Sequence, residues 1–170
     1  MPKTIKNIYD NSVSFENLLK AHKKARCGKR EKKKIILFEL KLEQELLELD
    51  KQLKNGRYKH GGYTKFKIYE PKERIIMASE YKDRVVHQWY VEKFIKPYFV
   101  PQFISTSYAG IEGRGMHKAS KDVQKAMRSA KSKWKNYYIL KMDVTKYFQN
   151  IDKRILWEIL KRMMKVKKLL

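Results

Sequence analysis

The sequence predicts an α+β fold built from helices, one β-hairpin and one buried strand. Apolar side chains recur every three or four residues before residue 56, after residue 80 and near the C-terminus, which is the period of helices packed on one face. Strand-forming residues flank a Pro-containing turn at residues 70–73, which indicates the hairpin. Hydrophobic residues make up 42% of the chain, enough to bury a core and to exclude a disordered basic tail.

The charge balance predicts a polyanionic partner. The chain has 41 Lys and Arg against 18 Asp and Glu, a formal net charge of +23. Such a field attracts nucleic acid first and an anionic membrane surface second, although some of the lysines only solvate exposed faces. Apolar runs are shorter than the roughly 20 residues that span a bilayer, so no membrane partner is expected. Because Cys27 is the only cysteine and no secretory signal begins the chain, we expect a reducing, cytoplasmic setting.

The first 56 residues are expected to be helical. Ser14 can cap a short helix, and Asn55-Gly56 can end a longer one, because Gly accepts the left-handed conformation common at helix C-termini. Between them, the basic run Lys23–Lys34 is either an exposed connection or an edge that faces nucleic acid. The longer helix is predicted from apolar residues three and four positions apart: Ile35, Phe38, Leu42, Leu46, Leu49 and Leu53.

Residues 57–136 combine the hairpin with two further helices. Strands are predicted on either side of the turn at residues 70–73. A helix over Tyr81–Lys96 should end at Pro97, because proline cannot continue the helical hydrogen-bond ladder. A second helix is expected to begin near Gly115, after a loop that contains further glycines.

Residues 137–170 contain the first candidate for chemistry. Tyr137–Met142 predicts a buried strand, and Asp143 follows it where the backbone projects a side chain out of the core. A carboxylate there can hold a divalent cation if other oxygens converge on it, although an Asp at a strand end more often forms a turn or a helix cap. The paired aromatics Tyr147 and Phe148 can form a floor beneath a nucleotide sugar.

Four strings, placed in a fixed order along the chain, carry a family resemblance. They are Tyr69-Glu70-Pro71-Lys72-Glu73-Arg74-Ile75-Ile76, then Asp83-Arg84-Val85-Val86-His87-Gln88, then Ser105-Thr106-Ser107-Tyr108-Ala109-Gly110 with Gly113-Arg114-Gly115-Met116-His117-Lys118-Ala119, and finally Asp143-Val144-Thr145-Lys146-Tyr147-Phe148-Gln149-Asn150-Ile151-Asp152. Together they resemble motifs of reverse transcriptases, most of all bacterial enzymes of the diversity-generating retroelement type, with group II intron enzymes as cousins. The resemblance covers about residues 58–160 and implies the fingers and a partial palm of a right-hand polymerase fold.

The resemblance implies an RNA-directed DNA polymerase, in which a primer 3′-hydroxyl attacks the α-phosphate of a deoxynucleotide. Two Mg²⁺ ions suit this chemistry, because one activates the attacking oxygen and the other stabilises the leaving pyrophosphate. By the match, Asp143 binds both metals and the Val144 carbonyl helps to ligate one of them. Phe148 matches the position that crowds the sugar 2′-hydroxyl; the alternative is an ordinary core aromatic. Asp152 is expected to cap the final helix.

Basic residues on the other strings are candidates for phosphate contacts. Lys72 and Arg74 on the hairpin are candidates to hold the triphosphate, because an Arg fork donates two hydrogen bonds and Lys acts as a point charge. The alternative is two solvated turn residues. Arg84 either braces the fingers through an ion pair with Asp83 or Glu80 or touches the template.

The Gly-Arg-Gly turn opens a helix whose free N–H groups favour phosphate. Arg114, His117 and Lys118 are therefore candidate contacts to the backbone of template or primer. His87, on a helix among apolar residues, is expected to be a hydrogen-bonded core residue and not a catalyst.

The domain organisation follows from the same resemblance. We expect an N-terminal helical extension at 1–56, fingers at 57–136, and the first strand and helix of an incomplete palm at 137–170. Reverse transcriptases also need an aromatic-x-Asp-Asp turn, and no Asp-Asp pair occurs in this sequence. We therefore expect this polypeptide not to polymerise alone, and to need a C-terminal polymerase half or an accessory protein.

Two functions are in competition, and a membrane-surface or ribosome-associated basic protein is a third, weaker hypothesis. The first is the polymerase portion, whose partners are an RNA template, a DNA or RNA primer and deoxynucleotide triphosphates. The alternative is a non-catalytic, basic RNA-binding module that uses the same surface to grip structured RNA. The net charge supports both functions. They differ in whether Asp143 is needed for activity.

Overall fold

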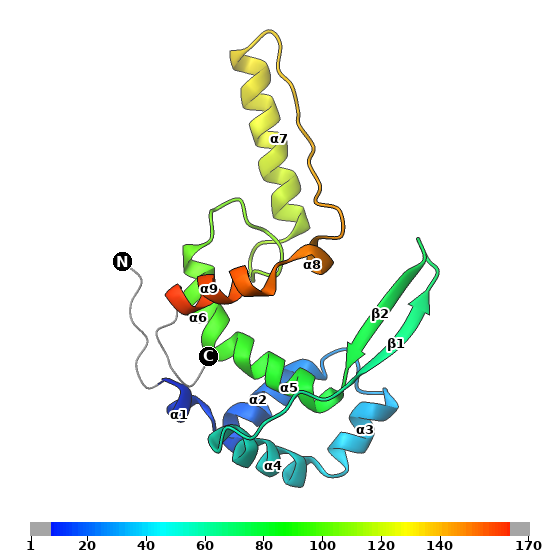
Figure 1. The fold of residues 1–170 in the computed structure, drawn as a ribbon. Coiled ribbons are helices and arrows are strands. Elements are labelled where there is room, and N and C mark those ends of the chain that lie inside the picture. Colours follow the sequence, from blue (N-terminus) through cyan, green and yellow to red (C-terminus); the bar gives the residue numbers. More distant parts are fainter. Residues whose placement is uncertain (1–7, 164–170) are drawn as a thin grey trace. The chain divides into compact units, whose positions relative to one another are not determined.

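The computed structural model describes residues 8–163 and confirms the α+β class (Figure 1). The chain divides into two compact units. One comprises the residues up to Pro97 and those from Trp157 onward, and the other comprises Tyr98–Leu156. Within residues 8–163, no helix combines the length and apolarity needed to cross a membrane.

The first unit begins with helices. They are α1 (Ile8–Ser12), α2 (Phe15–Ala25), α3 (Lys33–Glu39) and α4 (Leu42–Lys54). The predicted cap of α2 is confirmed, since Ser14 Oγ accepts a hydrogen bond from the Asn17 amide at 3.3 Å. The predicted stop of α4 is also confirmed, since Gly56 adopts a φ of 64° directly after that helix.

The single helix expected over residues 35–53 is wrong, because the chain breaks between α3 and α4. Lys41 leaves the helical region with φ −122° and ψ 28°, and Leu40 is 75% exposed. The break lets Ile35 on α3 and Leu46 on α4 both reach the core. Apolar spacings of three and four continue across the break, so the sequence pattern alone could not reveal it.

The predicted hairpin is confirmed. Strands β1 (Tyr63–Ile68) and β2 (Arg74–Ser79) pair antiparallel in a register that runs from Tyr63 opposite Ser79 to Ile68 opposite Arg74. Most side chains of both strands are exposed. Figure 1 shows the hairpin extending away from the N-terminal end of the helix that follows it. The basic residues of the turn therefore lie at the outer end of the hairpin.

The helix after the hairpin passes through Pro97 instead of ending there. Helix α5 (Tyr81–Tyr90) continues into the π-helical turn η1 (Val91–Ile95) and then α6 (Lys96–Phe99). A π-turn shifts the backbone hydrogen bonds by one residue, so Pro97 falls in the first turn of a new helical segment. Proline is tolerated there, because the N–H that it lacks would have no helical acceptor.

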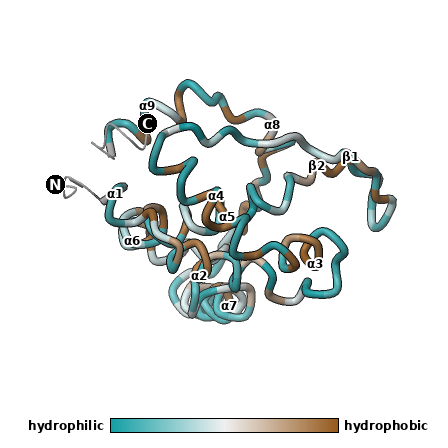
Figure 2. Tube along the Cα trace, turned by 90° about the horizontal axis from the view of Figure 1, so that it is seen from below, coloured by the Kyte–Doolittle hydropathy of each residue, from teal (hydrophilic) through white to brown (hydrophobic). Residues whose placement is uncertain are grey.

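The core of the first unit lies where α2, α4 and α5 meet. Leu18, Leu46, Val85 and Phe94 are completely buried in it. Figure 2 shows hydrophobic residues gathered on α2, α3 and α5, whereas α7 is largely hydrophilic. The indole N–H of Trp89 donates to the Ser12 carbonyl at 2.9 Å, which fixes the ring in this core.

A buried histidine links three helices of the first unit. His22 Nδ1 lies 3.0 Å from the Tyr81 hydroxyl, and His22 Nε2 lies 3.2 Å from Glu39 Oε1. The Tyr81 contact is within hydrogen-bond distance, whereas the buried Nε2 makes no hydrogen bond to any described residue despite its short distance to Glu39. Burial holds the pKa of His22 below its ordinary value, against the opposing effect of Glu39.

The second unit contains η2 (Val100–Gln102), α7 (Met116–Lys133) and α8 (Tyr147–Asn150), and α9 (Lys153–Met163) follows. The helix predicted from Gly115 is confirmed by α7. The buried strand predicted over Tyr137–Met142 is wrong: this segment is irregular, with Tyr138 95% and Leu140 78% exposed. A strand needs a neighbour to pair its N–H and C=O groups, and the described part of this unit offers no strand to pair with.

Candidate nucleic-acid interface

The outer end of the hairpin presents two of the predicted phosphate ligands. Lys72 lies in the turn and Arg74 begins β2, and both side chains are exposed. Neither has an ion-pair partner within residues 8–163. Beside them, Lys67 and Glu73 form an ion pair at 2.8 Å, but both are more than half exposed, so it contributes little stability. The two unpaired cations are available to an external phosphate.

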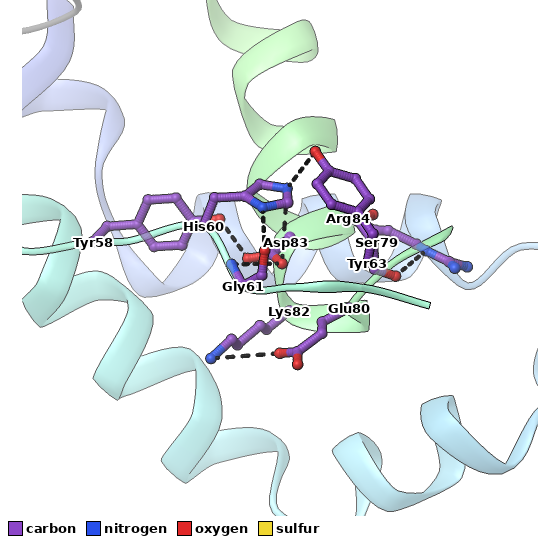
Figure 3. Close-up of polar contacts among 9 residues, drawn as sticks. All are labelled: Tyr58, His60, Gly61, Tyr63, Ser79, Glu80, Lys82, Asp83 and Arg84. Atoms are coloured by element: carbon purple, nitrogen blue, oxygen red, sulfur yellow. Dashed lines mark hydrogen bonds and ion pairs between the residues drawn. The ribbon is translucent and has the colours of Figure 1, made fainter. Parts of the chain in front are cut away.

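The base of the hairpin is held by one buried carboxylate (Figure 3). Asp83, in the first turn of α5, is fully buried. Its Oδ1 accepts from the Tyr58 hydroxyl at 2.6 Å, and its Oδ2 accepts from the Gly61 amide at 3.1 Å. These bonds provide the partners that a buried carboxylate needs. They tie the segment before β1 to α5, which fixes where β1 starts.

Burial and the neighbouring Asp83 carboxylate both change the pKa of the Tyr58 hydroxyl in the same direction. Burial first, and then the hydrogen bond to Asp83, raise the pKa of Tyr58 well above its ordinary value. The phenol therefore stays protonated at every physiological pH and remains a hydrogen-bond donor. Asp83 and Tyr58 thus form a permanent structural pair and not an acid–base couple for catalysis.

A stack of rings covers this pair. The His60 imidazole stacks on Tyr63 with ring centres 4.9 Å apart and on His87 with centres 5.3 Å apart. His60 Nε2 also lies 3.8 Å from Asp83 Oδ2. His87 is on the exposed side of α5, so its predicted place as a hydrogen-bonded core residue is wrong. Partial loss of hydration and the adjacent His60 nonetheless hold the pKa of His87 below its ordinary value.

Arg84 braces the hairpin through the backbone. Its Nε donates to the carbonyl of Ser79, the last residue of β2, at 3.2 Å (Figure 3). The ion pair predicted with Asp83 or Glu80 does not form, because Asp83 is occupied by Tyr58 and Glu80 lies near Lys82 at 3.7 Å. Arg84 is half-buried, so its guanidinium is only partly accessible to a template.

In the second unit, Arg114 holds the loop before α7 together. Its Nη1 donates to the carbonyls of Ile104 and Ser107, at 3.0 and 3.1 Å. The glycines on either side adopt left-handed conformations, with φ of 74° at Gly113 and 126° at Gly115. Arg114 therefore uses part of its donor capacity within the protein, which the sequence did not predict.

The first turn of α7 presents the other two predicted contacts. His117 is exposed. Lys118 forms an ion pair with Asp122 at 3.0 Å, and Asp122 also accepts from the Tyr108 hydroxyl at 2.8 Å. These bonds from Lys118 and Tyr108 hold the pKa of Asp122 below its ordinary value. Lys118 is consequently less available to phosphate than His117 or Lys72.

Asp143 lies in the irregular segment between α7 and α8, and its side chain is exposed. Val144 is exposed as well, and the Phe148 ring, 83% exposed, packs edge-on against Tyr147 with centres 5.3 Å apart. Lys146 turns the chain with a φ of 50°, which few residues other than Gly adopt. Because so much of its ring is exposed, Phe148 is not an ordinary core aromatic in this unit.

The predicted cap of the final helix is confirmed. Asp152 Oδ1 accepts from the amides of Arg154 and Ile155, at 2.8 and 3.4 Å, at the start of α9. The Arg154 amide and side chain hold the pKa of Asp152 below its ordinary value. This carboxylate caps the first turn of α9.

The acids of this chain do not by themselves fit a two-metal centre. Across residues 8–163, no three side chains of His, Cys, Asp or Glu converge on one point. Asp143 and the Val144 carbonyl would supply few of the oxygen ligands of such a centre, because Mg²⁺ prefers an octahedral shell and two ions share several carboxylates. The remaining protein ligands would have to come from elsewhere.

Sequence reasoning missed two residues that position the hairpin, Tyr58 and His60, and considered Asp83 only as part of a motif and as an ion-pair partner of Arg84. The available signal was the Gly61-Gly62 pair directly before the first strand, since a glycine often marks a close approach to other groups. Comparison of the chain with protein-family models and with curated proteins finds no match.

Proposed function

We propose that this chain is the fingers and first palm segment of an RNA-directed DNA polymerase. It holds an RNA template and its DNA or RNA primer through basic residues of both units. It contributes Asp143 and the Val144 carbonyl to a magnesium centre that needs further carboxylates from outside this sequence. The observation that carries the proposal is the order and register of the four strings along one chain.

The hairpin supports the proposal. Lys72 and Arg74 are exposed and unpaired within the described residues, while the base of the same hairpin is fixed by Asp83. A rigid base with accessible cations at the outer end suits a contact to triphosphate or strand phosphates, because little ordering entropy is lost on binding. Phe148, which is exposed five residues after Asp143, is available to a deoxynucleotide sugar.

The same argument assigns nucleic-acid contacts to the second unit. His117, in the first turn of α7, and the remaining donors of Arg114, just before that helix, contact phosphate. Lys118 also contacts phosphate when phosphate replaces Asp122 as its partner. Arg84 is the least accessible of the predicted contacts. Each phosphate that these cations neutralise releases counterions, so binding should weaken as salt rises.

One observation favours the alternative, a non-catalytic RNA-binding module. Among the described residues, no group of three or more His, Cys, Asp or Glu side chains could hold a metal ion, whereas the chain has a strong positive charge. On this reading, Asp143 has no role beyond solubility, and the basic surfaces account for all activity.

The two functions separate in one set of assays. RNA affinity is measured by fluorescence anisotropy, and primer extension is measured with Mg²⁺ after adding a polypeptide that carries a reverse transcriptase Tyr-x-Asp-Asp segment. As part of a polymerase, Asp143→Asn abolishes extension and leaves RNA affinity within twofold, whereas the control Glu112→Gln changes neither.

Charge reversal at Arg74 and Arg114 should weaken RNA binding under both functions. If Asp143→Asn leaves every measured activity intact while Arg74→Glu with Arg114→Glu abolishes binding, the RNA-binding module is correct. Extension by the chain alone would contradict the expectation that it lacks part of the metal centre.

A further inference from the structure

A groove lies on the first unit between α2 and the junction of α5 with η1. Its volume is about 380 Å³, within the range of sites that accept small ligands or single nucleotide units. Lys20 and Lys23 line it from α2, and Lys93 lines it from η1. None of the four strings contributes a residue to it.

The single acid in the groove is already neutralised. Glu92 accepts from Lys24 at 2.6 Å, from Lys96 at 2.5 Å and from the Gln88 amide at 3.1 Å. Burial opposes its ionisation, but the hydrogen bonds from Lys24 and Lys96 outweigh burial and hold the pKa of Glu92 below its ordinary value. The carboxylate therefore stays charged and paired.

Three cations of the groove have no such partner. Lys20, Lys23 and Lys93 form no hydrogen bond or ion pair through their side chains within residues 8–163. They belong to two different elements and line one cavity, so their charges add at the same place. This arrangement calls for an anion with more than one charge.

The floor of the groove is apolar and rigid. Ala21 and Trp89 line it, with 3% and 2% of their surfaces exposed. The Trp89 indole is fixed by its bond to Ser12 and by an edge-to-face contact with Phe94, with ring centres 5.3 Å apart. These contacts hold the apolar wall of the groove in place for the flat or apolar part of a ligand.

We propose that this groove binds one nucleotide unit of single-stranded RNA, with its two flanking phosphates on Lys20, Lys23 and Lys93 and the base or ribose against Ala21 and Trp89. The inference rests on the proposed binding of RNA and adds a second contact site to it. Lys93 of the groove lies twelve residues beyond Tyr81, the first residue of α5, which corresponds to about 18 Å along the helix formed by α5 and η1. A strand of about five stacked nucleotides covers that distance.

The test uses the full chain and a labelled 12-nucleotide RNA, with affinity measured from about 50 to 300 mM salt. The groove variant is Lys20→Gln/Lys23→Gln/Lys93→Gln. The matched control is Lys41→Gln/Lys51→Gln/Lys59→Gln, which removes the same charge from exposed lysines outside the groove. Circular dichroism establishes that both variants fold.

The groove variant should bind RNA at least tenfold more weakly than wild type at about 100 mM salt. Its log–log salt slope should fall by about 1.4, because single strands release about 0.7 counterion per phosphate contact and one nucleotide unit has two flanking phosphates. The control should stay within threefold of wild type. Acetylation footprinting should show RNA protecting Lys20, Lys23 and Lys93 but leaving Lys41 and Lys51 reactive.

Two results would overturn the inference while leaving the proposed function intact: equal affinity of the groove and control variants, or no protection of the groove lysines in a complex that does form. Displacement of RNA from these lysines by free AMP at the same concentration as the RNA would assign the groove to free nucleotides instead. Failure of the wild-type chain to bind RNA at all would overturn the proposed function itself.

Discussion

The Tyr58 hydroxyl lies 2.6 Å from Asp83 Oδ1, and the carboxylate that accepts this bond has no exposed surface. Tyr58 precedes the hairpin and Asp83 follows it, so the bond closes the base of the two strands. Together with the Gly61 amide, it determines where the hairpin leaves the helices. The role of this bond can be tested by measuring the free energy of unfolding of variants as well as their affinity for RNA.

Asp83→Asn should reduce the free energy of unfolding by about 2–4 kcal/mol, because the buried partners Tyr58 and Gly61 lose a charged acceptor. Urea denaturation at neutral pH measures the change. Glu73→Gln, which removes an exposed ion pair at the outer end of the hairpin, should cost less than about 0.5 kcal/mol. Equal effects of the two substitutions would show that the buried pair carries no special stability.

Gly61→Ala should destabilise the protein by about 1–2 kcal/mol. A methyl group at this position would lie 2.8 Å from Glu80 Oε2 and 3.0 Å from Asp83 Oδ2. The exposed Glu80 can move aside, but Asp83 is buried and cannot. Gly62→Ala is the control, because nothing lies within 4 Å of its added carbon. Thermal unfolding should show a lower Tm for the first variant only.

Stability should fall as pH drops from about 7.5 to 5.5. The pKa of His87 and that of His22 are both held below the ordinary 6.5, so the unfolded chain takes up protons first. The stability that these two histidines contribute is complete well above pH 6.5. It is lost as pH falls through 6.5 toward their folded-state pKa values. The lowered pKa of Glu39 changes stability only below its ordinary value of 4.5, so Glu39 does not affect stability between pH 5.5 and 7.5.

His87→Gln isolates the surface part of that effect. It removes the imidazole that stacks on His60 but leaves His22 in place. The slope of unfolding free energy against pH between 5.5 and 7.5, from urea titrations, should be smaller than in wild type. An unchanged slope would assign the whole pH dependence to other groups.

Arg114→Lys should loosen the loop before α7, because one ammonium on a flexible stem replaces a planar group that reaches two carbonyls. Amide hydrogen exchange around Ile104–Ser107 should become about fivefold faster or more. Arg128→Lys, on the exposed surface of α7, is the control and should leave exchange unchanged. Unchanged exchange in Arg114→Lys would show that the guanidinium is not needed to hold the loop.

Local elements were predictable where the signal was local. The Ser14 cap, the stop at Gly56, the hairpin turn and the Asp152 cap each depend on a residue whose own side chain or backbone makes the contact. The periodicity of apolar residues also predicted α7. It failed at the break between α3 and α4, because the apolar spacing continues across it.

The candidate site was predictable in its parts but not in its arrangement. The sequence identified Lys72, Arg74 and Asp143 by residue type and order, and all three are exposed. It could not show that Arg114 is partly used by its own loop. The Arg114 bonds reach carbonyls seven and ten residues earlier, which no spacing rule reports. The Lys118–Asp122 pair has the i,i+4 spacing of a helical ion pair and could have been read from the sequence.

By itself, the sequence determined the charge, the α+β class, the caps and the hairpin, because these follow from composition and from neighbours along the chain. Only the tertiary structure decided that Asp83 is buried beneath Tyr58 and that Tyr137–Met142 forms no strand. It also decided that lysines of α2 and η1 line one groove. The physical reason is that burial, strand pairing and summed charge all depend on groups that folding brings together from distant positions.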